Sequence, residues 1–162
     1  MVIQGTDSLA RLNTHLTSND FKIRELSAMN LGSISYNAIG KEQCIYANSI
    51  PPLCVMLTDK VPEVRTAATR ALASLAQYKE GKVQIYDLDK LNEIIALLYD
   101  KIEQTRLNVV QLICNVGEYP PAKEKFKECL PKLEQIVKDE KEEFPLVSKY
   151  AQCAIDVITW KA

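Results

Sequence analysis

The chain has 162 residues, with 20 Lys and Arg side chains against 21 Asp and Glu, so its formal net charge is -1. Apolar residues make up 47% and charged residues 25%, values typical of a globular domain and not of a disordered tail, a collagen-like fibre or a disulfide-rich miniprotein. A nucleic-acid-binding protein usually has a clear basic excess, and no segment approaches the roughly 18 apolar residues of a membrane span. The sequence predicts neither nucleic acid nor a membrane as a partner.

Five cysteines are scattered along the chain without a CxxC pair, and their number is odd. The N-terminus lacks the basic-then-apolar pattern of a secretory signal. Together these features predict reduced thiols in the cytosol.

One short phrase recurs along the chain with a constant step of 41 residues. Phe21–Arg24, Pro62–Arg65 and Glu103–Arg106 each end in an arginine, and the fourth copy reaches Val147, where the arginine is lost. Apolar residues follow the same step in several rows, among them Leu31, Leu72, Ile113 and Ala154, then Ile34, Leu75, Val116 and Val157, then Leu16, Leu57 and Leu98. A period near 41 lies within the roughly 40–47 residues of HEAT and armadillo repeats.

The second unit predicts three helices in order. Ile50–Leu57 has helical spacing and begins with two prolines, which suit a helix entrance. Asp59–Pro62 predicts a turn, and a long alanine-rich inner helix follows to Ala76. Gly81 is interpreted as the stop of that helix. A short third helix is expected at about residues 82–86.

The fourth unit departs from the period in its first half. Leu130 lies 39 residues after Leu91, whereas the second half of the unit returns to a step of 41. This shift predicts a two-residue insertion in the charged stretch Asp139–Glu143, which is therefore expected to be a surface turn.

The predicted fold class is all-α: a right-handed α-solenoid of about four armadillo/HEAT-like repeats in one domain, residues 1–162. Neither apolar stripe of a unit can be buried within that unit, so the units must stack with their inner helices along a concave face. A β-fold is disfavoured because period-two alternation is lacking. The repeats are expected at about 9–49, 50–88, 89–128 and 129–162.

The arginines are interpreted as a structural ladder between adjacent repeats. Asp59 and Asp100 each precede an arginine by six residues, and Ser18 takes the acidic place in the first unit. A guanidinium can serve a turn carbonyl and a carboxylate at once. An anion site is the alternative. The ladder residues are Arg24, Asp59, Arg65, Asp100 and Arg106.

Residues 50–85 resemble an armadillo repeat, with "IPPL" followed by "VRTAATRALASLA" and "EGK", and the same phrase resembles HEAT-like repeats. The C-terminal phrase Ala154–Ala162 is similar to that of the radial spoke protein 14 family, armadillo proteins of the ciliary and flagellar axoneme, also named after the rhabdoid tumour deletion region. This resemblance implies a non-catalytic structural subunit of the radial spoke. It implies spoke subunits and dynein-associated components as neighbours, and the cilium or flagellum axoneme as the location.

Armadillo proteins of the nuclear import adaptor type carry repeated Trp and Asn on the inner helix. The matching rows here hold no Trp and a single Asn, so binding of nuclear signals does not carry over. A polar row on the concave face remains as the candidate protein-binding surface. Its members are Met29, Ser33, Arg70, Ser74, Gln111, Asn115, Gln152 and Asp156.

No catalytic, cofactor-binding or metal-binding residue is predicted. His15 falls in an apolar row and is interpreted as a half-buried packing residue, and the scattered cysteines lack the spacing of zinc ligands. Phosphate loops and the GxSxG and HExxH motifs are missing from the sequence. Some HEAT-like proteins act on tetrapyrrole pigments, which keeps an enzymatic class open, but the sequence predicts no cofactor and no small-molecule substrate.

The sequence predicts different roles for the two ends of the solenoid. Trp160, after the last inner helix, is interpreted as a cap over the final repeat or as an anchor for a partner. The first unit begins abruptly at Leu9, so an apolar end covered by another protein is expected. The leading hypothesis is an axonemal scaffold that binds neighbours through its concave face and ends. The alternative is a general cytosolic adaptor that binds an extended peptide in its groove.

Overall fold

The computed structural model describes residues 3–161, and side chains from residue 8 onwards. Met1, Val2 and Ala162, the last residue of the C-terminal phrase, lie outside the described residues. Within that range the chain forms helices joined by short turns, and it contains no strand. None of the described helices is long and apolar enough to cross a membrane.

Within a repeat, the helices follow one another in a fixed order, and we call them the first, the inner and the third helix. The first helices are α1 (Ile3–His15), α4 (Ile50–Val55), α7 (Leu91–Ala96) and α10 (Leu130–Asp139). The inner helices are α2 (Phe21–Ile34), α5 (Pro62–Leu75), α8 (Glu103–Val116) and α11 (Pro145–Thr159). The third helices are α3 (Ala38–Tyr46), α6 (Lys79–Asp87) and α9 (Pro120–Phe126). Short 3₁₀ turns extend α4, α7 and α9 over Met56–Thr58, Leu97–Tyr99 and Lys127–Cys129.

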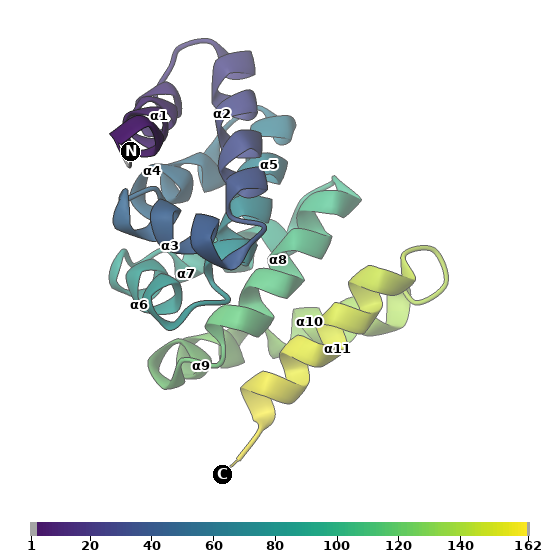
Figure 1. Ribbon diagram of the computed structural model, residues 1–162. Coiled ribbons are helices and arrows are strands. Elements are labelled where there is room, and N and C mark those ends of the chain that lie inside the picture. The colour runs from purple at the N-terminus through teal and green to yellow at the C-terminus, as the bar shows by residue number, and fades with distance from the viewer. Residues whose placement is uncertain (1–2, 162) are drawn as a thin grey trace.

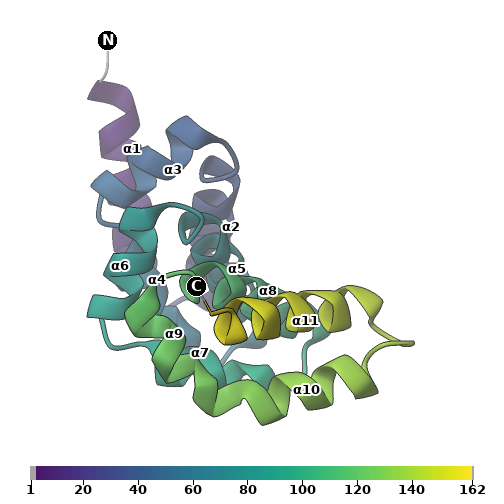
Figure 2. The ribbon, with the colours of Figure 1, turned by 90° about the horizontal axis from the view of Figure 1, so that it is seen from below.

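The inner helices form a stack. Each packs against the next, α2 on α5, α5 on α8 and α8 on α11, and Figure 1 shows them as successive steps from the first repeat to the last. Seen from below in Figure 2, α6, α9, α7 and α10 lie along the outer side of this stack. The predicted all-helical solenoid is therefore confirmed.

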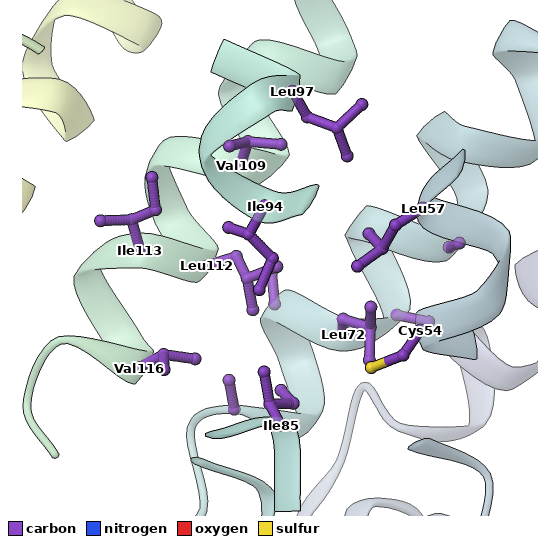
Figure 3. Close-up of a cluster of buried hydrophobic side chains, with 14 of the residues drawn as sticks. Cys54, Leu57, Leu72, Ile85, Ile94, Leu97, Val109, Leu112, Ile113 and Val116 are labelled. Carbon is purple, nitrogen blue, oxygen red and sulfur yellow. The ribbon is translucent and has the colours of Figure 1, made fainter. Parts of the chain in front are cut away.

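The periodic apolar rows form the core. Leu72 and Ile113 of the inner helices and Leu57 and Leu98 of the turns before them are at most 1% exposed. Figure 3 shows part of this core, with side chains such as Leu72 from the second and third repeats gathered in one cluster. Full burial of such side chains contributes about 1.5–3 kcal/mol each, so the stacking of repeats is the main source of stability.

Gly81 does not end the inner helix, which corrects the sequence-based interpretation. It lies in the first turn of α6, which begins at Lys79, while α5 has already ended at Leu75. No described glycine has a positive φ. A Cβ at Gly81 would run into the carbonyl of Leu75, and one at Gly40 into the carbonyl of Ile34. These glycines therefore let each third helix cross close to the end of its inner helix.

The irregular register of the fourth repeat has two structural sources. Asn48 and Asp89, with φ of 59° and 53°, make a left-handed turn before α4 and α7. No such turn precedes α10, because α9 runs through a 3₁₀ turn directly into it. The connection at residues 140–144 before α11 is two residues longer than the one at residues 100–102 before α8. The predicted insertion in the charged stretch is therefore confirmed.

Candidate functional site

The arginine of each inner helix reaches the carboxylate of the turn in the next repeat. In the first step, Arg24 donates from Nε to Asp59 at 2.7 Å and from a second nitrogen at 3.1 Å. A third nitrogen donates to the carbonyl of Ser18 at 2.8 Å. One oxygen of Asp59 also accepts from the backbone N–H of Val61, at the entrance of α5. The pair therefore ties two repeats and a helix start together.

The same geometry recurs along the stack. Arg65 donates to Asp100 at 2.7 Å and to the carbonyl of Asp59 at 2.8 Å. Arg106 donates twice to Glu140, at 2.9 Å each. Glu140 was not identified from the sequence, because the register shift of the fourth repeat moves its carboxylate off the 41-residue step.

The pKa of Asp59 reflects this arrangement. Burial of the carboxylate acts to raise its pKa, but the hydrogen bonds from Arg24 and from the Val61 N–H outweigh it and lower the pKa below its usual range. The carboxylate therefore stays charged, and its charge contributes to holding the repeats together.

The concave face carries two adjoining hollows, which we call the groove. The larger, about 660 Å³, lies along the N-terminal halves of α2, α5 and α8, with Met29 and Glu63 in its wall. The smaller, about 510 Å³, lies toward the C-terminal ends of the same helices and includes Asn115. Arg70 and Gln111 line both hollows, so they stand at the middle of the groove.

The predicted polar row divides into tethered and available side chains. Ser74 donates to the carbonyl of Ser35 at 2.7 Å, and Asn115 donates to the carbonyl of Ala73 at 2.9 Å. These two side chains therefore bridge neighbouring inner helices.

The remaining polar members of the row lie on all four inner helices. Ser33 bonds within α2, and Gln152 bonds Asp156 within α11, so these side chains use local partners. Arg70 and Gln111 make no side-chain hydrogen bond within the described residues. Whether the row binds a protein stays a prediction.

Several lining residues were not identified from the sequence. Lys41, Gln77, Tyr36 and Tyr150 line the smaller hollow. Lys41 lies on α3, outside the inner-helix rows on which the prediction was based. The sequence did contain a sign that Lys41 belongs to the repeat pattern, because Lys41 and Lys82 are one 41-residue step apart.

The groups considered for chemistry lie apart from the groove, with one exception. His15 is exposed at the end of α1, so its interpretation as a half-buried packing residue is wrong. Cys114 lines the smaller hollow, and its sulfur lies 2.8 Å from that of Cys153 on the next inner helix. Burial and this contact raise the pKa of Cys114 to about 12, so its thiol is protonated at neutral pH. In the described part of the chain, no three His, Cys, Asp or Glu side chains gather as metal ligands would.

The two ends of the stack both expose large apolar side chains. Leu26 of α2 is 55% exposed, whereas Ala67, one period later, is 7% exposed because a preceding inner helix covers it. Trp160 is 65% exposed, with its ring 5.2 Å from the ammonium of Lys123. A ring so open to solvent covers little of the last repeat, and its role as a cap or as an anchor stays a prediction.

The HEAT repeat family model matches residues 50–79, which run from α4 to the start of α6. No curated protein matches the sequence.

Among solved structures, a designed armadillo repeat protein in complex with the peptide (KR)4 is 25% identical, with a TM-score of 0.83 over 94% of this chain and 65% of that one. Computationally designed armadillo repeat proteins for modular peptide recognition are 27% identical, with a TM-score of 0.82 over 92% of this chain and 63% of that one. The chain thus spans less than two thirds of the length of these designs. The inner-helix stack, the 41-residue period and these likenesses agree that the protein is an all-helical solenoid of the armadillo/HEAT type.

Proposed function

We propose that the protein is a non-catalytic scaffold that binds an extended polypeptide segment in the groove. The observation that carries this proposal is the continuity of the two hollows through Arg70 and Gln111, on inner helices held in place by the arginine ladder. The fixed spacing of the inner helices suits an extended peptide, because its backbone groups recur at regular intervals along the stack. The peptide recognition named for the designed relatives agrees with this use of the face.

A peptide array tests the proposal directly. The purified protein is probed against an array of extended peptides of varied charge, beside Gln111→Trp, which fills the middle of the groove. Asn92→Trp, at an exposed position of α7, is the matched control. We expect the tryptophan at position 111 to abolish binding and the one at position 92 to leave it intact. Failure of the wild-type protein to bind any peptide, or equal binding by both variants, would contradict the proposal.

We propose as the biological setting the radial spoke of the ciliary or flagellar axoneme. Support comes from the resemblance of the C-terminal phrase and from the exposure of Trp160 at its end, since a neighbouring subunit would bury such a ring. In this setting the exposed apolar ends of the stack would contact spoke or dynein-associated neighbours.

The alternative is a general cytosolic adaptor that binds a linear motif in the groove. Localisation of the tagged protein in a ciliated cell, with cross-linking to its neighbours, separates the two. Recovery with isolated axonemes at a fixed ratio to spoke subunits, reduced by Trp160→Ala, favours the spoke. A diffuse cytoplasmic pool that is unaffected by this substitution favours the adaptor.

A further inference from the structure

The smaller hollow of the groove has an unusual balance of charge. Two cationic side chains, Lys41 and Arg70, line it, and no Asp or Glu does. Its other polar lining is neutral and includes the amides of Gln77 and Gln111. Neither cation forms an ion pair with any described carboxylate.

Lys41 is a buried cation. The residue as a whole is only 7% exposed, and its ammonium donates a hydrogen bond to the carbonyl of Tyr36 at 3.2 Å. An ammonium has three N–H donors, and this is its only described hydrogen bond. Removing a charged group from water is costly unless an opposite charge or further hydrogen bonds replace the solvent. The site therefore favours an acceptor with negative charge.

The next repeat contains the same lysine with its partner in place. Lys82, one period after Lys41, forms an ion pair with Glu118, which lies in the turn that follows the next inner helix, α8. The position one period before Glu118 is Gln77, so the position facing Lys41 holds a neutral amide where the position facing Lys82 holds a carboxylate. Gln77 lines the same hollow as Lys41. The first repeat thus keeps the cation and lacks the internal anion.

We infer that the smaller hollow binds an acidic side chain, Asp or Glu, of an extended peptide, with Lys41 and Arg70 as its partners. This inference rests on the proposed function and specifies the chemistry of the ligand. A carboxylate placed there would take the role that Glu118 plays toward Lys82. Arg70, exposed at the middle of the groove, can offer it a two-pronged guanidinium contact.

Binding is measured by fluorescence anisotropy with three labelled peptides of equal length, alternating Glu-Ser, Gln-Ser and Lys-Ser. We expect the wild-type protein to bind Glu-Ser at least about tenfold more tightly than either of the others. Arg70→Gln should weaken this binding about tenfold, and Arg70→Glu should shift the preference toward Lys-Ser. Arg11→Gln makes the same chemical change at an exposed position of α1 and should leave binding unchanged.

Gln77→Glu is the sharpest variant. It places a carboxylate one period before Glu118, so Lys41 gains an internal partner and the acidic side chain of the peptide no longer finds a free ammonium there. We expect affinity for Glu-Ser to fall about tenfold or more, while the thermal midpoint stays equal or rises. This variant avoids removing the buried Lys41, which could unfold the protein.

Two failures can be told apart. If none of the peptides binds, both the proposed function and this inference fail. If all three bind equally, or if Lys-Ser binds best, the groove still binds peptides but the inference is overturned. A Gln-Ser peptide phosphorylated on serine is a fourth probe, and its binding in place of Glu-Ser would also overturn the assignment to carboxylate side chains.

Discussion

Removing Arg24 should cost much of the protein's stability. Arg24→Met keeps most of the apolar stem and deletes two hydrogen bonds to Asp59 and one to the Ser18 carbonyl. It leaves the Asp59 side chain, which is 7% exposed, with the Val61 N–H as its remaining partner. A charge-assisted hydrogen bond contributes about 1.5–3 kcal/mol, and loss of one partner of a fully buried pair costs about 3–5 kcal/mol.

The Arg24 side chain is 16% exposed, so solvent offsets part of this loss. We expect the free energy of unfolding to fall by about 2–3 kcal/mol, and the thermal midpoint by about 2–4 °C per kcal/mol. Urea unfolding followed by circular dichroism measures the change. Lys22→Met, which removes an ion pair whose lysine is 60% exposed, is the control and should change the free energy of unfolding far less than Arg24→Met does.

A double-mutant cycle tests the reasoning. Asp59→Leu combined with Arg24→Met removes both charges, so the double variant should be less destabilised than the two single effects together, with a coupling of about 1 kcal/mol or more. Coupling within about 0.3 kcal/mol of zero would show that the pair does not hold the repeats together, and the interpretation as a ladder would be wrong.

The contribution of the Arg24–Asp59 pair to stability should also depend on pH. The pKa of Asp59 is lowered in the folded protein, so its contribution is fully present above the unfolded value of about 3.9 and is lost as pH falls through the folded pKa. The stability difference between wild type and Arg24→Met should therefore be constant at neutral pH and shrink in strong acid. A difference independent of pH would contradict the role of the charge.

Three further predictions concern packing and the thiols. Gly81→Ala should lower the free energy of unfolding by about 1–3 kcal/mol, because its Cβ meets the Leu75 carbonyl. Gly32→Ala, whose Cβ lies 3.8 Å from its neighbours, should leave that free energy unchanged or raise it by up to about 1 kcal/mol. Urea unfolding measures both changes. Cys54, whose pKa burial raises to about 12, should resist iodoacetamide at pH 8 until urea unfolds the protein, and rapid labelling of the folded chain by mass spectrometry would refute its burial. Leu72→Ala, at a fully buried position, should cost about 2–5 kcal/mol, and a loss below about 1 kcal/mol would mean that the inner helices are not closely packed there.

Much of this architecture follows from the sequence alone. The constant step places Leu31, Leu72 and Ile113 in one row, and helical spacing makes that row one face, so stacking is the way to bury it. The arginines at the same step indicated a contact between repeats. Even the extra residues before α11 were visible, because a shift of register at one point in an otherwise regular pattern marks a turn.

The sequence does not show which groups a residue meets when they come from another helix or another repeat. Gly81 looks like a helix stop, but only the crossing of α6 over the end of α5 shows that it makes room for a carbonyl. Glu140 replaces the expected carboxylate because the chain reaches the same point in space after a different number of residues.

The burial of Lys41 and its lack of a carboxylate partner are likewise decided by the tertiary structure. In the sequence it is one lysine among many, and its burial and its place in the groove depend on how α3 packs against the inner stack. Periodicity determines which residues share a face, since that is a local property of the helix. Which charges lack a partner depends on side chains about 40 positions away, and these meet only when the repeats stack.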